Sequence, residues 1–131
     1  RLGQNILTMA DFTLEEINRY SKQLMLDEVG VEGQLKLKKA KVLVVGAGGL
    51  GCPVLQYLNA AGIGTLGIVD FDKIEIHNLH RQILYSTDDI GKPKAATAAS
   101  KLKLANPNVQ FIVFEELLQE TNATDIISQF D

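Results

Sequence analysis

A run of glycines between two apolar stretches is the first feature that could serve chemistry. Residues 46–51 fit the pattern G-x-G-x-x-G, with glycines at Gly46, Gly48, Gly49 and Gly51. Glycine permits a tight turn and close backbone approach, so amide groups and the dipole of a following helix can face a phosphate. The pattern predicts a nucleotide site. Glycines that serve only helix–strand packing are the alternative.

Asp70 stands 70 − 51 = 19 residues after the last glycine, at the end of the second apolar stretch. An acidic residue about 20 residues beyond such a loop accepts hydrogen bonds from ribose hydroxyls in dinucleotide-binding domains. The carboxylate supports a nucleotide site. It does not distinguish ATP from NAD, because both contain adenosine and phosphates.

Two basic residues favour ATP. ATP carries about four negative charges, whereas a dinucleotide carries about two. An enzyme that attacks the α-phosphate of ATP must therefore place cations along the phosphates. Arg81 is the first. We expect four apolar neighbours to half-bury its side chain as a bidentate phosphate clamp, namely Ile76, Leu79, Ile83 and Leu84. A surface salt bridge to Asp72 or Glu75 is the alternative.

Lys94 is the second cation. Pro93 predicts a helix start, which places Lys94 in the first turn, where the helix dipole disfavours a positive charge. Residues that break a local rule often serve function, and a bound phosphate would make this position favourable. A solvated surface lysine is the alternative, and Lys92 is interpreted as a surface residue.

The hydrophobic pattern predicts the elements that position these residues. Thr13 and Glu16 form a capping box that predicts a helix over residues 14–28, broken by Gly30 and Gly33. A short helix over residues 34–39 should follow. Strands and helices then alternate. The expected strands cover residues 41–45, 65–69 and 109–114, and the expected helices cover residues 52–61, 93–105 and 121–130.

This alternation predicts a Rossmann-like, doubly wound α/β fold with a parallel sheet. The first strand is expected to be buried on both faces, with the second and third strands to one side of it. Because the pattern stops after three strands, we expect one truncated nucleotide-binding domain over 1–131. A helical segment over 1–40 would precede the N-terminal half of the Rossmann-like sheet over 41–131.

Composition excludes several classes of protein. The chain has 131 residues, 46% hydrophobic and 22% charged, which is typical of one globular domain. Its net charge of −3 gives no basic surplus for nucleic acid, and no apolar run reaches the roughly 20 residues of a membrane helix. The apolar stretch at residues 6–10 is too short for a signal peptide. We expect a cytoplasmic protein whose one cysteine, Cys52, is a small packed residue.

Five motifs resemble, in order and near spacing, the ThiF/MoeB/HesA family and, more distantly, the ubiquitin-activating enzymes. They are Arg19-Tyr20-Ser21-Lys22-Gln23, the glycine loop 46–51, Asp70-Phe71-Asp72, Asn78-Leu79-His80-Arg81-Gln82 and Gly91-Lys92-Pro93-Lys94. The resemblance implies ATP-dependent adenylation of the C-terminal glycine carboxylate of a ubiquitin-like sulfur-carrier protein. The resemblance leaves the pathway open among molybdopterin biosynthesis, thiamine biosynthesis and another sulfur-carrier route.

The resemblance also implies residue roles. Arg81 and Lys94 are the catalytic candidates, and the nucleotide-binding set is Gly46, Gly48, Gly49, Gly51, Asp70, Asp72, Asn78, Arg81, Gln82 and Lys94. Many members send an arginine across a homodimer interface to the γ-phosphate. Lys22 stands there in this sequence and keeps the charge without the planar fork. A solvated helix face is the alternative for Lys22. The Mg²⁺ aspartate and the zinc cysteines of many members would lie beyond Asp131, so the segment alone is expected to be inactive and to hold no metal ligand.

Two other functions remain open. An NAD-binding Rossmann domain would not need Arg81 and Lys94. A non-catalytic family member that only binds a carrier or another partner would tolerate a lysine at position 22.

Overall fold

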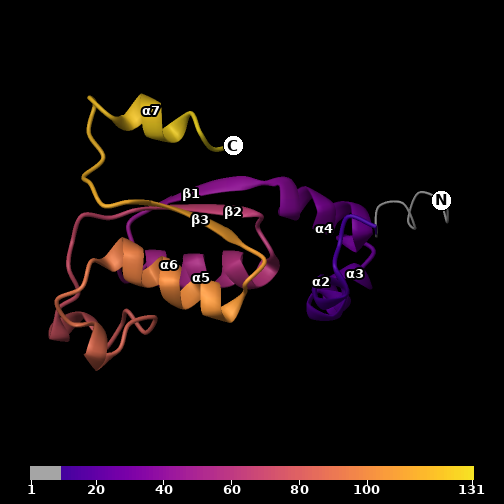
Figure 1. Ribbon diagram of the computed structural model, residues 1–131, viewed down its shortest axis with the longest axis horizontal. Helices are drawn as coiled ribbons and strands as arrows, with labels where there is room; N and C mark the ends of the chain where they lie inside the picture. Colours follow the sequence, from indigo (N-terminus) through magenta and orange to yellow (C-terminus); the bar gives the residue numbers. More distant parts are fainter. Residues whose placement is uncertain (1–9) are drawn as a thin grey trace.

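The computed structural model describes residues 10–131 (Figure 1). The apolar stretch considered as a signal peptide lies, apart from Ala10, outside these residues. The elements in chain order are α2 (Leu14–Arg19), α3 (Ser21–Leu24), α4 (Gly30–Lys39), β1 (Lys41–Val45), α5 (Gly51–Ala61), β2 (Thr65–Val69), the 3-10 helices η1 (Ile76–Asn78) and η2 (Thr87–Asp89), α6 (Lys94–Ala105), β3 (Gln110–Phe114) and α7 (Ala123–Ile127).

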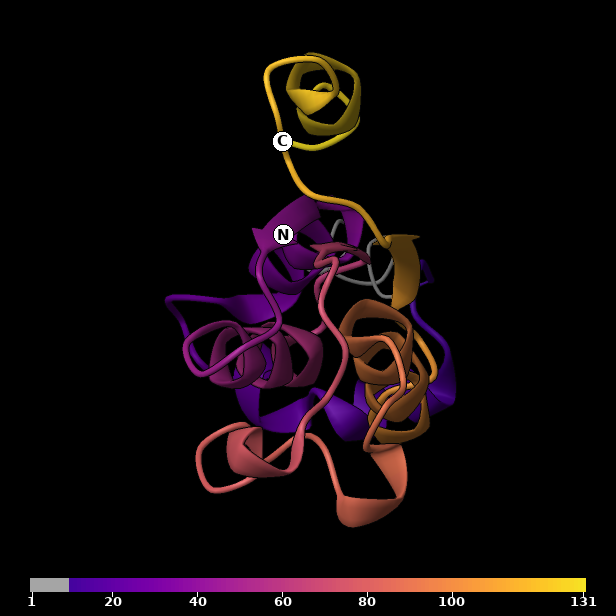
Figure 2. The same cartoon turned by 90° about the vertical axis from the view of Figure 1, so that its left-hand side faces the viewer.

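The three strands form a parallel sheet in the order β1-β2-β3. Helices α5 and α6 cover one face, and α7 lies over the other (Figures 1 and 2). A Cβ on Gly67 of β2 would stand 2.3 Å from the Phe130 ring, so glycine lets the segment after α7 pack closely on the sheet. The predicted α/β fold and strand order are confirmed, with β1 at one edge of the described sheet.

The most buried strand is β2, whereas β1 is the strand that the sequence predicts to be buried on both faces. Leu66, Ile68 and Val69 of β2 are almost fully buried, while β1 is half-buried and its Val45 is 57% exposed. The prediction that β1 is buried on both faces is wrong for these residues. The reason is position: β2 has a strand on each side, whereas β1 has one.

The N-terminal helices differ from the predicted pattern. The capping box is confirmed, since Thr13 and Glu16 exchange hydrogen bonds of 3.0 and 3.1 Å. The single helix predicted over 14–28 is wrong, because the chain leaves helical geometry at Tyr20 and helix α3 ends at Leu24. The glycines do not break a helix either, since α4 begins at Gly30 and runs through position 33.

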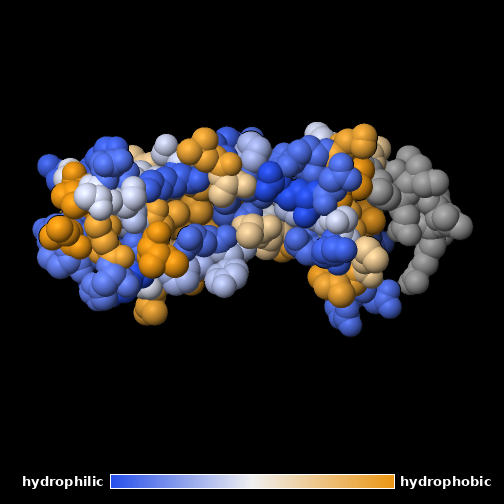
Figure 3. Space-filling view, turned by 90° about the horizontal axis from the view of Figure 1, so that it is seen from below, coloured by the Kyte–Doolittle hydropathy of each residue, from blue (hydrophilic) through white to orange (hydrophobic). Residues whose placement is uncertain are grey.

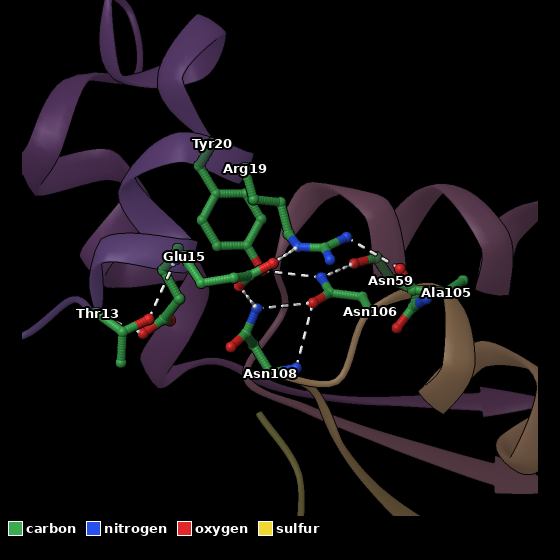
Figure 4. A network of polar contacts seen from close by, with 9 residues as sticks. Thr13, Glu15, Arg19, Tyr20, Asn59, Ala105, Asn106 and Asn108 are labelled. Carbon is green, nitrogen blue, oxygen red and sulfur yellow. Dashed lines mark hydrogen bonds and ion pairs between the residues drawn. The ribbon is translucent and has the colours of Figure 1, made fainter.

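A buried polar network ties these helices to the rest of the chain (Figure 4). Asn106, at the end of α6, donates from Nδ2 to the Tyr20 hydroxyl and to the carbonyl of Asn59, both at 2.8 Å. Arg19 donates from Nη1 to the carbonyl of Ala105 at 2.9 Å. Tyr20 and Asn106 are 2% and 1% exposed. The interruption of the helix at Tyr20 therefore places the Tyr20 hydroxyl where it accepts a tertiary hydrogen bond from Asn106.

A buried carboxylate holds the connection between β2 and α6. Asp89 is 5% exposed, and its Oδ2 accepts from Lys101 Nζ at 2.5 Å and from the backbone amide of Ser86 at 2.8 Å. Lys92 is exposed, as expected, and its Nζ lies 3.6 Å from Asp89 Oδ1. Burial raises the pKa of Asp89, but the hydrogen bonds from Lys101 and Ser86 outweigh it and lower the pKa from 3.8 to about 2.

We predict that Asp89→Asn lowers the free energy of unfolding by roughly 2 kcal/mol at pH 7, the linkage value of a shift near two pKa units. Because the folded pKa is depressed, this stabilisation is complete above the unfolded pKa near 4 and is lost as pH falls through about 2. Urea denaturation at pH 7, 4 and 2.5 should show the difference between wild type and variant narrowing. The exposed neighbour Asp88 provides the control, Asp88→Asn, and a pH-independent difference for Asp89→Asn would contradict this account.

Candidate functional site

The glycine loop joins the end of β1 to the start of α5. Gly46 has a φ of +99°, a left-handed conformation that favours glycine, and its amide donates to the Val69 carbonyl at 2.7 Å. A Cβ on Gly51 would stand 1.9 Å from the carbonyl oxygen of Gly46, so no side chain fits there. Gly51 therefore serves close packing of the helix start against the loop, and Gly46 serves the left-handed turn.

Gly48 and Gly49 face the connection that carries the predicted cation. A Cβ on Gly49 would lie 3.6 Å from Arg81 Nε, and one on Gly48 would lie 3.6 Å from Gln82 Nε2. The structure thus brings the middle of the glycine loop against Arg81 and Gln82, as the sequence motifs implied.

Arg81 is exposed, so the prediction that apolar neighbours half-bury its side chain is wrong. Ile76 and Ile83 are themselves 71% and 72% exposed and form no frame around it. The side chain instead lies along the glycine loop, with Nη1 donating to the carbonyl of His77 at 3.1 Å. Within residues 10–131 it forms no ion pair with either alternative carboxylate, which leaves most of its guanidinium donors free.

Lys94 is 6% exposed, which contradicts the alternative of a solvated surface lysine. It is the first residue of α6, and its backbone amide donates to the carbonyl of Asp72 at 3.0 Å. In the described part of the chain, its ammonium forms no ion pair, and it is not among the fully enclosed atoms that lack a partner. The side chain is therefore buried along most of its length while the ammonium still reaches the surface, and a cation without a counter-charge there favours a bound anion.

Gln82 also has a polar group without a partner in the described chain. Its side chain is 3% exposed, and its Oε1 is buried without a partner among residues 10–131. Buried polar atoms are normally hydrogen-bonded, and exceptions often mark functional sites. Lys94 and Gln82 therefore both have unused polar groups beside the glycine loop.

Asp70 links the loop to the following segment. Its Oδ2 accepts from the amide of Ala47 and its Oδ1 from the amide of Asp72, both at 2.8 Å. Each carboxylate oxygen keeps a further lone pair, so Asp70 can still accept from a ribose. Asn78 is buried and its Oδ1 accepts from the Glu75 amide at 2.9 Å, which organises η1. Its Nδ2 lies 3.4 Å from His77 Nδ1 and has a second hydrogen to donate.

Two buried side chains support the loop from below. Tyr85 donates from its hydroxyl to the Ala47 carbonyl at 2.7 Å and approaches the Lys94 carbonyl at 3.4 Å. Cys52 is fully buried and donates from Sγ to the same Ala47 carbonyl at 3.3 Å. Burial raises the pKa of the Cys52 thiol, which fits a packed residue and not a nucleophile. The sequence motifs assign no role to Tyr85. The only feature that could have indicated one is its position, since it is an aromatic residue with a hydroxyl group between the motifs at 78–82 and 91–94.

A pocket of about 300 Å³ opens at the carboxyl ends of the strands. Its lining residues are Val45, Gly46, Val69, Asp70, Phe71, Asp72, Glu116, Leu117 and Leu118. Sequence analysis missed the wall formed by residues 116–118. The rule that ligands of open α/β sheets bind at the carboxyl ends of strands would have found it, because this segment follows β3.

Lys22 lies away from this cluster. Its helix α3 packs near the amino ends of the strands, where Gln23 Nε2 donates to Gln34 Oε1 at 2.9 Å and to the Ala61 carbonyl at 3.0 Å (Figure 1). Ala61 is the last residue of α5, and the glycine loop lies at the other end of that helix. Lys22 itself is exposed. It does not reach the glycine loop of its own chain.

Residues 10–131 contain no group of three His, Cys, Asp or Glu side chains suited to a metal ion. No helix in the same range has the length and apolar character needed to cross a membrane.

The fold and this cluster define a Rossmann-like α/β domain with its glycine loop at the carboxyl ends of the strands. The chain belongs to the ThiF family, whose model matches residues 20–131. It is 51% identical over 120 residues to the sulfur carrier protein adenylyltransferase of Thermus thermophilus, covering 92% of this chain and 44% of that protein. It is 52% identical over 120 residues to a probable molybdopterin-synthase adenylyltransferase of Porphyra purpurea, covering 92% of this chain and 31% of that protein.

A solved structure supports the fold. The crystal structure of Escherichia coli MccB with AMPCPP and MccA has a TM-score of 0.75 and 34% identity, covering 84% of this chain and 34% of that one. The chain spans less than half the length of each of these three proteins.

We predict that two glycines of the loop respond differently to alanine. Gly51→Ala should lower the free energy of unfolding by about 1–3 kcal/mol or more, because its Cβ would clash with the Gly46 backbone. Gly49→Ala should change stability by less than about 0.5 kcal/mol, because its Cβ meets only the Arg81 side chain at ordinary distance. Chemical denaturation of both variants tests this. Equal losses of unfolding free energy would contradict the view that Gly51 is required for packing and Gly49 is not.

Proposed function

We propose that the complete protein binds ATP at the glycine loop and adenylates the C-terminal glycine carboxylate of a ubiquitin-like sulfur-carrier protein. The observation that carries the proposal is Lys94, a largely buried lysine whose ammonium forms no ion pair in the described chain and whose backbone is linked to the glycine loop through Tyr85. The names of the two curated relatives, adenylyltransferases for a sulfur carrier and for molybdopterin synthase, support the same reaction. The AMPCPP of the MccB structure supports a nucleotide ligand.

Each group has a separate part in this proposal. The amides of the loop and Arg81, which lies along Gly49, would bind the phosphates together with Lys94. Asp70 would accept from the ribose, and the apolar pocket beside Phe71 would take the adenine. Asn78 and Gln82 would complete the binding set around the phosphates, and Asp72, which lines the same pocket as Asp70, would belong to the nucleoside side.

The proposed reaction is a displacement at the α-phosphorus. An oxygen of the carrier's carboxylate forms the new P–O bond, and the bond to the β-phosphate breaks to release pyrophosphate. This leaves an acyl-adenylate. No side chain has to act as nucleophile, since alignment of the reactants and neutralisation of the developing charge by Arg81 and Lys94 suffice.

Mg²⁺ would accompany ATP in this reaction. We propose that the Mg²⁺ aspartate, and any zinc cysteines, belong to the part of the relatives' length that this chain does not span. On this proposal the described segment alone is inactive. Molybdopterin- and thiamine-type carriers both fit the chemistry, and we propose a cytoplasmic protein.

We further propose a homodimer in which Lys22 of one copy approaches the phosphates bound by the other. The exposure of Lys22 and its distance from its own loop support a contact in trans. Leu50, Val54 and Tyr57 are 87%, 47% and 78% exposed and follow one side of α5 from the glycine loop. Figure 3 shows the surface on the side of α5 and α6, where hydrophobic groups are interspersed with hydrophilic ones. Exposed apolar residues beside a charged site suit an interface.

ATP should bind the complete protein about tenfold or more tightly than NAD, the scale of one additional charge-assisted contact. Titration calorimetry with each nucleotide measures the two dissociation constants. Tighter binding of NAD would favour the dinucleotide-binding alternative. Tight ATP binding without carboxylate-dependent pyrophosphate exchange would favour the non-catalytic alternative.

Arg81→Ala and Lys94→Met should each lower carboxylate-dependent pyrophosphate exchange by about 10²-fold, the effect of losing one transition-state charge contact. Lys94→Met should not lower the stability of the ligand-free protein, because the Lys94 side chain is largely buried, its charge has no ion-pair partner in the described chain, and methionine has a similar length. Lys92→Ala is the matched control, since its side chain is 58% exposed two residues away. Near wild-type exchange for both site variants would identify them as ordinary surface and packing residues.

A further inference from the structure

The wall of the pocket opposite the glycine loop is a segment without helix or strand. Residues 115–122 connect β3 to α7, and Leu117 and Leu118 from this segment line the pocket with Phe71 and Asp70. Leu117 is 49% exposed, so burial of apolar surface holds it only in part. Something else must keep this wall in place.

Asn122 supplies the hydrogen bonds that do so. Its Nδ2 donates to Glu116 Oε1 at 2.8 Å and to the carbonyl of Leu117 at 2.9 Å. Its Oδ1 accepts from the amide of Gln119 at 2.7 Å. Among residues 10–131, all side-chain hydrogen bonds that hold residues 115–121 involve Asn122. One amide group uses both its donors and its acceptor on a single loop.

The direction of these bonds separates two roles for Asn122. It stands immediately before α7, where an asparagine often caps a helix. Its side chain makes no cap hydrogen bond to α7, and all its bonds run backward to positions 116, 117 and 119. Asn122 therefore organises the pocket wall and not the helix.

We infer that Asn122 is a positioning residue for the nucleoside end of the site; this inference rests on the proposed ATP function. By fixing the Leu117 carbonyl, Asn122 holds the wall that packs against the base, and a preformed wall reduces the ordering cost of binding. The phosphate-binding groups, Arg81 and Lys94, belong to other segments and make no bond to this loop in the described chain. Loss of the Asn122 side chain should therefore weaken binding of the base and leave binding of the phosphates unchanged.

The test uses Asn122→Ala in the complete protein, with ATP and inorganic tripolyphosphate as separate probes. We expect the dissociation constant and KM for ATP to rise about three- to tenfold, the scale of one net hydrogen bond or slightly more. Affinity for tripolyphosphate, kcat at saturating ATP and the melting temperature should stay close to wild type. Asn122→Asp, which keeps only the acceptor for Gln119, should show most of the same loss.

Gln129→Ala serves as the control. It removes a hydrogen bond from the end of α7 to the Asp125 carbonyl, away from the pocket lining, and should bind ATP as wild type does.

Unchanged ATP affinity in Asn122→Ala, or an equal loss for ATP and tripolyphosphate, would overturn the role of Asn122 while leaving the proposed function intact. Failure of the wild-type protein to bind ATP at all would overturn the proposed function, and the inference with it.

Discussion

The backbone amide and carbonyl of Ala47 connect three parts of the proposed site, namely the glycine loop, Asp70 at the end of β2, and the start of α6 at Lys94. The amide nitrogen of Ala47 donates to Asp70 at 2.8 Å, and its carbonyl accepts from Tyr85 at 2.7 Å and from Cys52 at 3.3 Å. Tyr85 also approaches the carbonyl of Lys94. Because Ala47 is itself fully buried, the loop cannot move without disturbing both the acidic strand end and the helix that carries the cation. Preorganisation of this kind fixes donors before a ligand arrives.

Two polar side chains beside the glycine loop have groups without partners in the described chain. The buried Oε1 of Gln82 lacks a hydrogen bond and the ammonium of Lys94 lacks an ion pair, while the loop's Gly48 and Gly49 leave room for a ligand. Asn59 Oδ1, near the other end of α5, is also unpartnered, so the missing bond alone does not mark the site. Asp89, only five positions before Lys94, is by contrast fully paired. One connection thus contains a satisfied buried charge that fixes the backbone and an unsatisfied one that suits an anion. Proteins commonly break a general rule of polar pairing at a functional site and satisfy it in the surrounding structure.

Local signals were sufficient for parts of this structure. The capping box at Thr13, the glycine loop and the three strands depend on neighbouring residues and could be predicted. The break at Tyr20 depends on a hydrogen bond to Asn106, 86 residues away, which no helical pattern contains. Helix α4 passes through Gly33 because tertiary packing overrides a propensity cost of about 1 kcal/mol. The exposure of Arg81 likewise depends on how its connection folds back over Gly49.

The ends of the sheet divide the motifs into two groups. Four motifs gather at the carboxyl ends of the strands, while Arg19, Tyr20 and Gln23 bind backbone and side chains at the amino ends. Helix α5, with 11 residues, alone separates these ends by about 16 Å. The anchored members of the first motif fix the orientation of α3 and leave Lys22 facing solvent. In a two-fold symmetric pair, any contact from one copy to the other is repeated in reverse. The homodimer proposed above would therefore complete two equivalent sites with one rigid element from each chain.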